Sequence, residues 1–278
     1  MVAAAAQKPA RHARGGSARY IRSHWRLLLR VTGQDLRLRH AGSLIGLGWV
    51  ALGPLLILGV YSAIYLEVFT VRGANPIGLD GFPYVLYIFC GLVPYLSVAE
   101  GLGRGVGSVI ANKAVLNNTV YPIDLAPVQT ALGAQAVMLV GMPLVILGAI
   151  LTGYADWTIL AVPIVVALML IWLVGMNWIL SMLNVAFRDL QNLITVILMI
   201  LLVASPFAYT TAQLPSVVRP IVWLNPFAYF VIAFQHLIMR GEFPAAWQVV
   251  VLVLMPIGTF VLGSWFFANA KGVLLDYV

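Results

Sequence analysis

The stretch WTILAVPIVVALMLIWLVGMNWILSMLNVAFRDLQNLITVILMILLVASP, residues 157–206, contains two apolar runs that meet at an arginine and an aspartate. Each run approaches the ~20 apolar residues that a membrane-spanning helix needs. Arg188 and Asp189 are the charged residues of the whole stretch. The stretch therefore predicts two membrane-spanning helices joined by a short charged connection at a membrane surface.

The rest of the chain extends this pattern. Its 278 residues are 62% hydrophobic and only 9% charged, and the mean hydropathy is +0.98. This composition exceeds what a soluble core requires, and it predicts an all-α polytopic membrane protein with one transmembrane domain over residues 41–278. We expect six transmembrane helices, at about 44–66, 83–108, 124–152, 157–185, 190–210 and 246–269.

Residues 211–244 are too apolar for a plain loop and are interrupted by Pro215, Pro220 and Pro226. Neither half is long enough to span a membrane alone. Irregular backbone at membrane depth survives only when it is buried in protein or lines a wet cavity. We expect a re-entrant helical hairpin on the outer side, with its turn near Asn225-Pro226; the alternative is an amphipathic surface hairpin.

The N-terminal region carries most of the positive charge. Residues 1–40 hold nine of the sixteen basic residues and one acid, which is a net +8, whereas the remainder is −1. The positive-inside rule places this segment, and with six spans also the C-terminus, in the cytoplasm. We expect a multi-pass protein of the inner membrane with a disordered cytoplasmic tail over residues 1–18. Nucleic-acid binding is disfavoured because the arginines flank a span.

Residues 19–40 have the pattern of an amphipathic interface helix. At 100° per residue the arginines gather on one arc, with apolar residues on the adjoining arc. Its exposed face is either a generic membrane anchor or also the binding face for a partner. The residues that carry this pattern include Arg22, Trp25, Arg26 and Arg30.

Few residues are suited to catalysis. The chain has no Gly-x-x-x-x-Gly-Lys-[Ser/Thr] phosphate-binding loop, and its four histidines show no metal-ligand spacing. We expect no enzyme activity and no cofactor in this chain. Glu100 and Arg104 are spaced to form an i,i+4 ion pair. The small residues of GLGRGVG (101–107) are expected to let neighbouring helices pack closely. Cys90 is expected to pack inside a span.

Aromatic residues are frequent in the first third of the chain. Tyr and Trp at the ends of spans usually anchor them in the membrane interface, but flat rings with a polar edge also suit sugar rings. Under the second interpretation a possible substrate path is formed by Trp49, Tyr61, Tyr65, Tyr84, Tyr87, Tyr95 and Glu100.

Four stretches in order resemble the membrane subunit (permease) of an ABC exporter of the polysaccharide class, which moves O-antigen, capsule, teichoic acid or cell-wall galactan. They are RHAGSLIGLGWVALGPLLILGVYSAIYLEVF (39–69), NKAVLNNTVYPIDLAPV (112–128), LNVAFRDLQNL (183–193), and SPFAYTTAQLP with LNPFAYFVIAFQHLIMRGEFP (205–244). The resemblance covers about residues 20–244. The chain departs from the family at Asn118-Thr119, where Lys-Lys is usual, and at Gln235-His236, where Tyr-Arg is frequent.

The resemblance implies an ATP-driven exporter of a lipid-linked polysaccharide, built from a homodimer of this chain and two copies of a separate ATPase that holds ATP and Mg. A drug or lipid exporter of the same fold is the alternative; a membrane-embedded sugar transferase is disfavoured because the acids are widely spaced. The resemblance also places the interface helix beside the ATPase.

It further assigns residues to coupling and to gating. The implied coupling residues are Asn112, Lys113, Leu116, Tyr121, Pro122, Phe187, Arg188 and Asp189. The implied outer gate consists of Pro215, Pro220, Trp223, Asn225 and Pro226. Arg188 and Asp189 are expected to contact the ATPase; the simpler interpretation is that Asp189 caps the fifth span.

Overall fold

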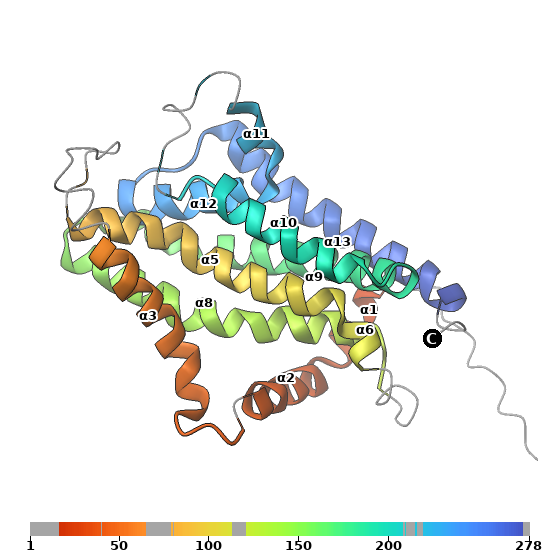
Figure 1. Ribbon diagram of the computed structural model, residues 1–278. Coiled ribbons are helices and arrows are strands. Elements are labelled where there is room, and N and C mark those ends of the chain that lie inside the picture. The colour runs from red at the N-terminus through yellow and green to blue at the C-terminus, as the bar shows by residue number, and fades with distance from the viewer. Residues whose placement is uncertain are drawn as a thin grey trace, which may run out of the picture.

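The computed structural model describes residues 17–39, 41–64, 79, 81–112, 121–207, 209, 215 and 219–274. All regular elements in these ranges are helical, as the sequence predicts (Figure 1). The elements are α1 (Ala18–Ser23), α2 (Trp25–Arg39), η1 (Gly46–Gly48), α3 (Trp49–Ile64), α5 (Phe82–Val106), α6 (Ser108–Ala111), α8 (Leu125–Leu151), η3 (Trp157–Ala161), α9 (Val162–Ala186), α10 (Leu190–Ala204), α11 (Arg219–Leu224), α12 (Pro226–Gln235), η5 (His236–Arg240) and α13 (Ala246–Leu274).

Four helical segments have the length and hydropathy of a membrane span, and they confirm four of the predicted spans. They are Phe82–Val106, Leu125–Leu151, Trp157–Ala186 and Ala246–Gly272. The first and fifth predicted spans correspond to shorter apolar helices, Trp49–Val60 within α3 and Leu190–Ala204. The described chain therefore has four full-length spans, and the count of six stays a prediction.

The helix α10 ends at Ala204, earlier than the predicted end at residue 210, for a local reason. Pro206 disfavours the helical conformation in the residue before it, and Ser205 is extended, with ψ 142°. The 15 residues of α10 extend over roughly 22 Å at 1.5 Å per residue. That length is short of a ~30 Å hydrocarbon core.

Two helix contacts organise the bundle. The helix α5 lies against α8, α9 and α12, and its residues from Tyr84 to Tyr95 are all buried, including Cys90. The second contact is the long seam between α9 and α13, in which the backbones meet at Gly175 and Gly263. Glycine removes the side chains that would keep two helices apart.

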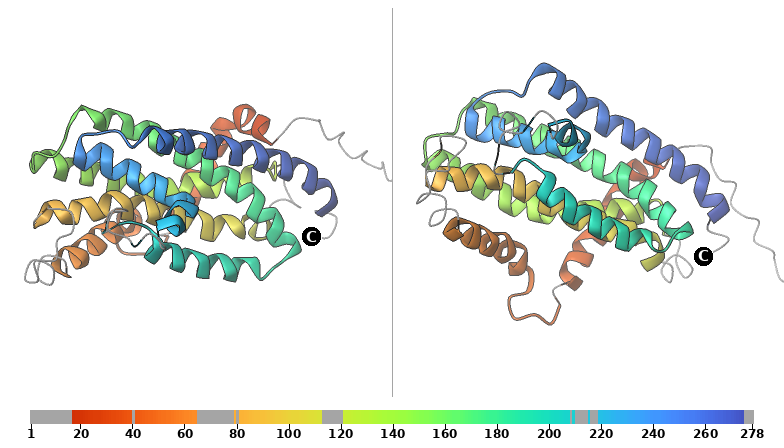
Figure 2. Two further views of the ribbon diagram at one scale, coloured as in Figure 1. Left: turned by 90° about the horizontal axis from the view of Figure 1, so that it is seen from above. Right: turned by 45° about the horizontal axis from the view of Figure 1, so that its top comes forward.

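The segment predicted as a hairpin bends at the expected place. Asn225 separates α11 from α12, and its side chain accepts a hydrogen bond from the Phe227 N–H at 2.9 Å. The second arm, α12 with η5, is buried against α5, α9 and α13 (Figures 1 and 2). In the described part the second arm is therefore a core element, which contradicts the alternative of a surface hairpin. Its re-entrant placement in a membrane stays a prediction.

The residues of the predicted interface helix form two helices, α1 and α2, which meet at a turn at His24, and their position in a membrane interface stays a prediction. Leu28 is fully buried, and α2 packs on α8. Leu29 and Leu38 are exposed on α2 beside its arginines. An exposed mixture of apolar and basic side chains is typical of a helix in a membrane interface. Residues 1–16 of the predicted tail lie outside the described residues.

Candidate functional site

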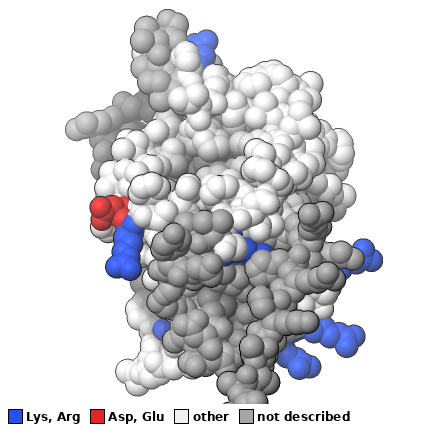
Figure 3. Space-filling view, turned by 90° about the vertical axis from the view of Figure 1, so that its right-hand side faces the viewer, with Lys and Arg blue, Asp and Glu red and all other residues white. Residues whose placement is uncertain are grey.

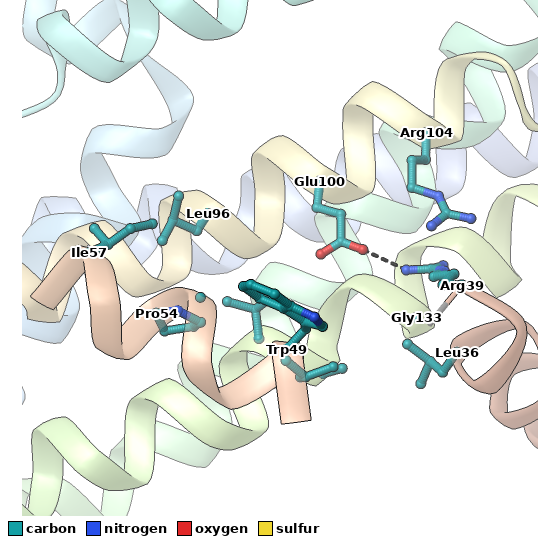
Figure 4. A pocket seen from close by; sticks show the side chains of 13 residues that line it. Leu36, Arg39, Trp49, Pro54, Ile57, Leu96, Glu100, Arg104 and Gly133 are labelled. Atoms are coloured by element: carbon teal, nitrogen blue, oxygen red, sulfur yellow. Dashed lines mark hydrogen bonds and ion pairs between the residues drawn. The ribbon is translucent and has the colours of Figure 1, made fainter. Parts of the chain in front are cut away.

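Four charged side chains from α2 and α5 meet at one place, which we call the ionic cluster: Asp35, Arg39, Glu100 and Arg104. The Arg39 guanidinium lies 2.5 Å from Glu100 Oε1 and 2.5 Å from Asp35 Oδ2. Arg104 reaches the same Asp35 oxygen at 3.5 Å. Figure 4 shows the Glu100 carboxylate directed at Arg39 across the gap between the two helices. Two positive and two negative charges thus balance one another.

The ionic cluster corrects one prediction. Glu100 does not pair with Arg104, although the i,i+4 spacing suggested it; Glu100 pairs with Arg39 instead. Arg39 can approach because residue 133 of α8 is glycine, where a Cβ atom would lie 2.7 Å from Arg39 Nη2. A charge in a membrane protein is expensive unless it is paired. The pairing therefore fixes α2 against α5 and α8.

An apolar groove of about 390 Å³ opens beside the ionic cluster (Figure 4). The helix α3 forms one wall, and α5 and α8 form the other. Glu100 and Arg104 stand at its polar end, and Trp49 lies within it with 42% of its surface exposed. We call it the Trp49 groove. Its lining includes Leu36, Trp49, Pro54, Ile57, Leu96 and Val137.

A second, more polar groove of about 430 Å³ lies on the other side of Arg104. Asp35 and Arg104 line it together with Asn112, Gln129 and Gln191. Asn112 is one of the predicted coupling residues, and its amide bonds the Ser108 carbonyl at 2.8 Å. The two grooves share the Arg104 side chain, so the ionic cluster separates an apolar compartment from a polar one.

The predicted coupling residues in the described chain lie at one end of the bundle. Phe187, Arg188 and Asp189 form the break between α9 and α10, and all three are exposed. Asp189 occupies the N-cap position of α10, but its side chain accepts no capping bond there. Seen from this end, most of the visible basic side chains lie toward the edge of the described surface, and one of them adjoins an acidic side chain (Figure 3).

The remaining coupling residues flank the segment before α8. Tyr121 donates a hydrogen bond to Gln129 Oε1 at 3.1 Å, and burial raises the pKa of its phenol to about 12. The phenol therefore stays a neutral donor at physiological pH. Pro122 follows it at the entrance to α8 and is partly buried. Lys113 and Leu116 lie outside the described residues.

The structure does not bring the predicted path residues together. Only Trp49 and Glu100 line the Trp49 groove. Tyr84, Tyr87 and Tyr95 lie on α5 and are buried in the core of the bundle. The Tyr95 hydroxyl donates a hydrogen bond to the Leu198 carbonyl. The Tyr61 side chain and Tyr65 lie outside the described residues.

The predicted outer-gate residues are anchored to the bundle around Asn225. The Asn225 amide donates to Ser205 Oγ at 2.9 Å. The Trp223 ring packs edge-on against Trp247, with 4.7 Å between the centroids. Pro226 begins α12, Pro220 lies within α11, and Pro215 precedes α11 on the exposed surface. The buried break after α10 and the hairpin turn are thus joined directly.

Sequence reasoning missed the most buried charged contact of the described chain. Asp124, only 3% exposed, lies 2.9 Å and 3.0 Å from the Lys271 ammonium through its two oxygens. The Ser17 hydroxyl donates to the same carboxylate at 2.5 Å, and the Trp178 indole donates to the Asp124 carbonyl at 2.9 Å. We call this the Asp124 clasp, because it joins α8, α9, α13 and the start of α1.

The four full-length apolar helices define the class, an integral membrane protein, and the matches to known proteins support a transport role. Residues 127–239, from the start of α8 to η5, match the family described as ABC-2 type transporter.

Two similar proteins are each named O-antigen export system permease protein RfbA. The one from Klebsiella pneumoniae is 27% identical over 218 residues, which cover 77% of this chain and 81% of the relative. The one from Myxococcus xanthus is 26% identical over 223 residues, covering 79% and 83%. The resemblance to a permease subunit of a polysaccharide ABC exporter, predicted from four sequence stretches, is confirmed.

Proposed function

We propose that this chain is the transmembrane subunit of an ATP-driven exporter that moves a lipid-linked polysaccharide from the cytoplasmic side across the inner membrane. A separate nucleotide-binding subunit hydrolyses the ATP. The observation that carries the proposal is the similarity to O-antigen export permeases over more than three quarters of the chain. That similarity is supported by a bundle whose predicted coupling break is exposed at one end.

The proposed pore requires two copies of the chain. The helix α10 leaves room for this arrangement, because among its residues only Ile194 and Leu198 are buried and a broad apolar face is uncovered. Met199 and Val203 on that face are 64% and 80% exposed. Membrane lipid or a second copy is the environment that such a face requires.

The Trp49 groove is the part of the proposed path that the described residues support best. It combines an exposed indole with carboxylate and guanidinium groups at its polar end. A flat ring stacks on the apolar face of a sugar, and paired charged groups offer both donors and acceptors to hydroxyls. The proposed outer gate is the hairpin around Asn225, which is joined to the end of α10 through Ser205.

Co-expression with the ATPase encoded nearest to this chain tests the proposal. We expect the two proteins to purify together in mild detergent, to hydrolyse ATP, and to hydrolyse it several-fold faster when lipid-linked glycan is added. A complex that responds to drugs or free lipids and ignores the glycan would favour the same-fold alternative. A chain that purifies without any ATPase would contradict the proposed function.

Arg188→Ala is expected to reduce glycan export and glycan-stimulated ATP hydrolysis about 30-fold while the complex still assembles. Arg188 is exposed at the break between α9 and α10, where a charge-assisted bond to a partner is available. Truncating one partner of a charged interface pair costs ~2 kcal/mol or more. The matched control is Arg188→Lys, which keeps the positive charge at the same exposed break. Equal export by both variants would exclude a coupling role for the positive charge of Arg188.

A further inference from the structure

A third groove, of about 540 Å³, lies between the N-terminal helices and α13. Its lining residues are Ala18, Ile21, Arg22, Trp25 and Phe260. Arg22 is the charged member, and the other walls are apolar. We call it the Arg22 groove. It is distinct from the Trp49 groove, which lies between α3, α5 and α8 and shares no residue with it.

The walls of the Arg22 groove are fixed by contacts from outside it. The Ala18 N–H donates to Ser264 Oγ at 3.0 Å, so the start of α1 is attached to α13 one turn beyond Phe260. The Phe260 ring packs on Trp178 with 5.2 Å between the centroids. Leu28, fully buried, anchors α2 on the bundle. The groove is therefore a preformed feature of the bundle surface.

The charge around the groove is uncompensated. Arg22 at the end of α1 and Arg26 and Arg30 in α2 are exposed, and the latter two are four residues apart, so they share one side of α2. Within the described ranges, no carboxylate lies within 4 Å of any of the three guanidinium groups. Arg39, further along the same helix, is held by two carboxylates. Among the described residues Arg22 therefore borders the apolar groove without a carboxylate partner, whereas Arg39 is part of the ionic cluster.

We propose that the Arg22 groove binds an anionic glycerophospholipid of the surrounding leaflet. One acyl chain lies along Ile21 and Phe260, and the phosphate contacts Arg22 and Arg26. Trp25, 46% exposed, lies at the boundary between them, where an amphipathic ring is favoured. An acidic protein surface would satisfy the arginines but would leave the apolar walls uncovered; a lipid covers both. Basic side chains on amphipathic helices are attracted to anionic lipid.

The test is lipid binding to the purified full chain, measured by native mass spectrometry with dioleoyl phosphatidylglycerol and dioleoyl phosphatidylcholine as probes. We expect tighter binding of phosphatidylglycerol, and roughly 30-fold weaker binding in the variant R22Q/R26Q, about fivefold for each arginine. Ala18→Leu, which narrows the groove without changing charge, is expected to weaken both lipids. Thermal melting shows that each variant is folded.

Arg37→Gln provides the matched control, because it removes the same charge from the same helix about 16 Å away from Arg26. It should retain the preference for phosphatidylglycerol. A loss of about fivefold in R37Q, equal to the loss in the single variant R22Q, would reveal diffuse attraction and overturn the proposal. Unchanged lipid binding in R22Q/R26Q, with loss of the co-purifying ATPase, would assign the arginines to a protein interface and also overturn it. The lipid proposal does not depend on the proposed export function.

Discussion

Replacing Asp124 by alanine is expected to lower the free energy of unfolding by about 3–5 kcal/mol, which is the cost of breaking a buried ion pair by removing one partner. The Lys271 side chain is only 12% exposed, and its ammonium would lose both carboxylate oxygens. Ser17 would lose its acceptor as well. The change in the free energy of unfolding is measured by titrating the protein, purified in mild detergent, with a denaturing detergent.

Two further variants separate the ion pair from general damage to the helix. Asp124→Leu combined with Lys271→Met removes both charges, and it should recover much of the lost stability, since the cost lies in the unpaired ion. Glu242→Ala breaks a pair with Arg240 in which Glu242 is 55% exposed, and it should cost less than 1 kcal/mol. A double variant as unstable as Asp124→Ala would show that the carboxylate acts through something other than Lys271.

The long spans could be predicted because each depends on its own run of apolar residues. The four helices of full length agree with the predicted bounds within a few residues, except that α13 continues past 269 to Leu274. The turn at Asn225-Pro226 was also predictable, since proline fixes its own backbone and asparagine caps the helix that follows. The overlooked boundary, at Ser205-Pro206, carried the same kind of local signal.

Pairings between distant residues could not be predicted in this way. Glu100 has Arg104 within one turn, yet it binds Arg39, 61 positions away, because α2 is held against α5 and α8. Asp124 and Lys271 are separated by 147 positions, and neither lies in a motif. A buried acid next to an apolar run indicates that a basic partner lies close to it in the folded protein. The partner's identity depends on how the helices pack, and the packing involves the whole chain.

The seam between α9 and α13 gives the second large effect. A Cβ atom on Gly175 would lie 2.6 Å from the backbone carbonyl carbon of Thr259, and a Cβ atom on Gly263 would press on the carbonyl oxygen of Gly175. Backbone atoms cannot rotate away as side chains can. Gly263→Ala is therefore expected to force the two helices apart along their most extensive contact and to lower the free energy of unfolding by about 3 kcal/mol, at the upper end for overpacking.

Gly258→Ala is the control on the same helix, because a Cβ atom there would meet nothing within 4 Å. Alanine is favoured over glycine in a helix by ~1 kcal/mol, so this change should be neutral or stabilising. The two substitutions are chemically identical and five residues apart. Opposite changes in the free energy of unfolding are expected because only the neighbouring atoms differ. If Gly263→Ala were as well tolerated as Gly258→Ala, the close approach of α9 and α13 could not be what sets the position of α13. The Asp124 clasp at the end of α13 would then have to position that helix.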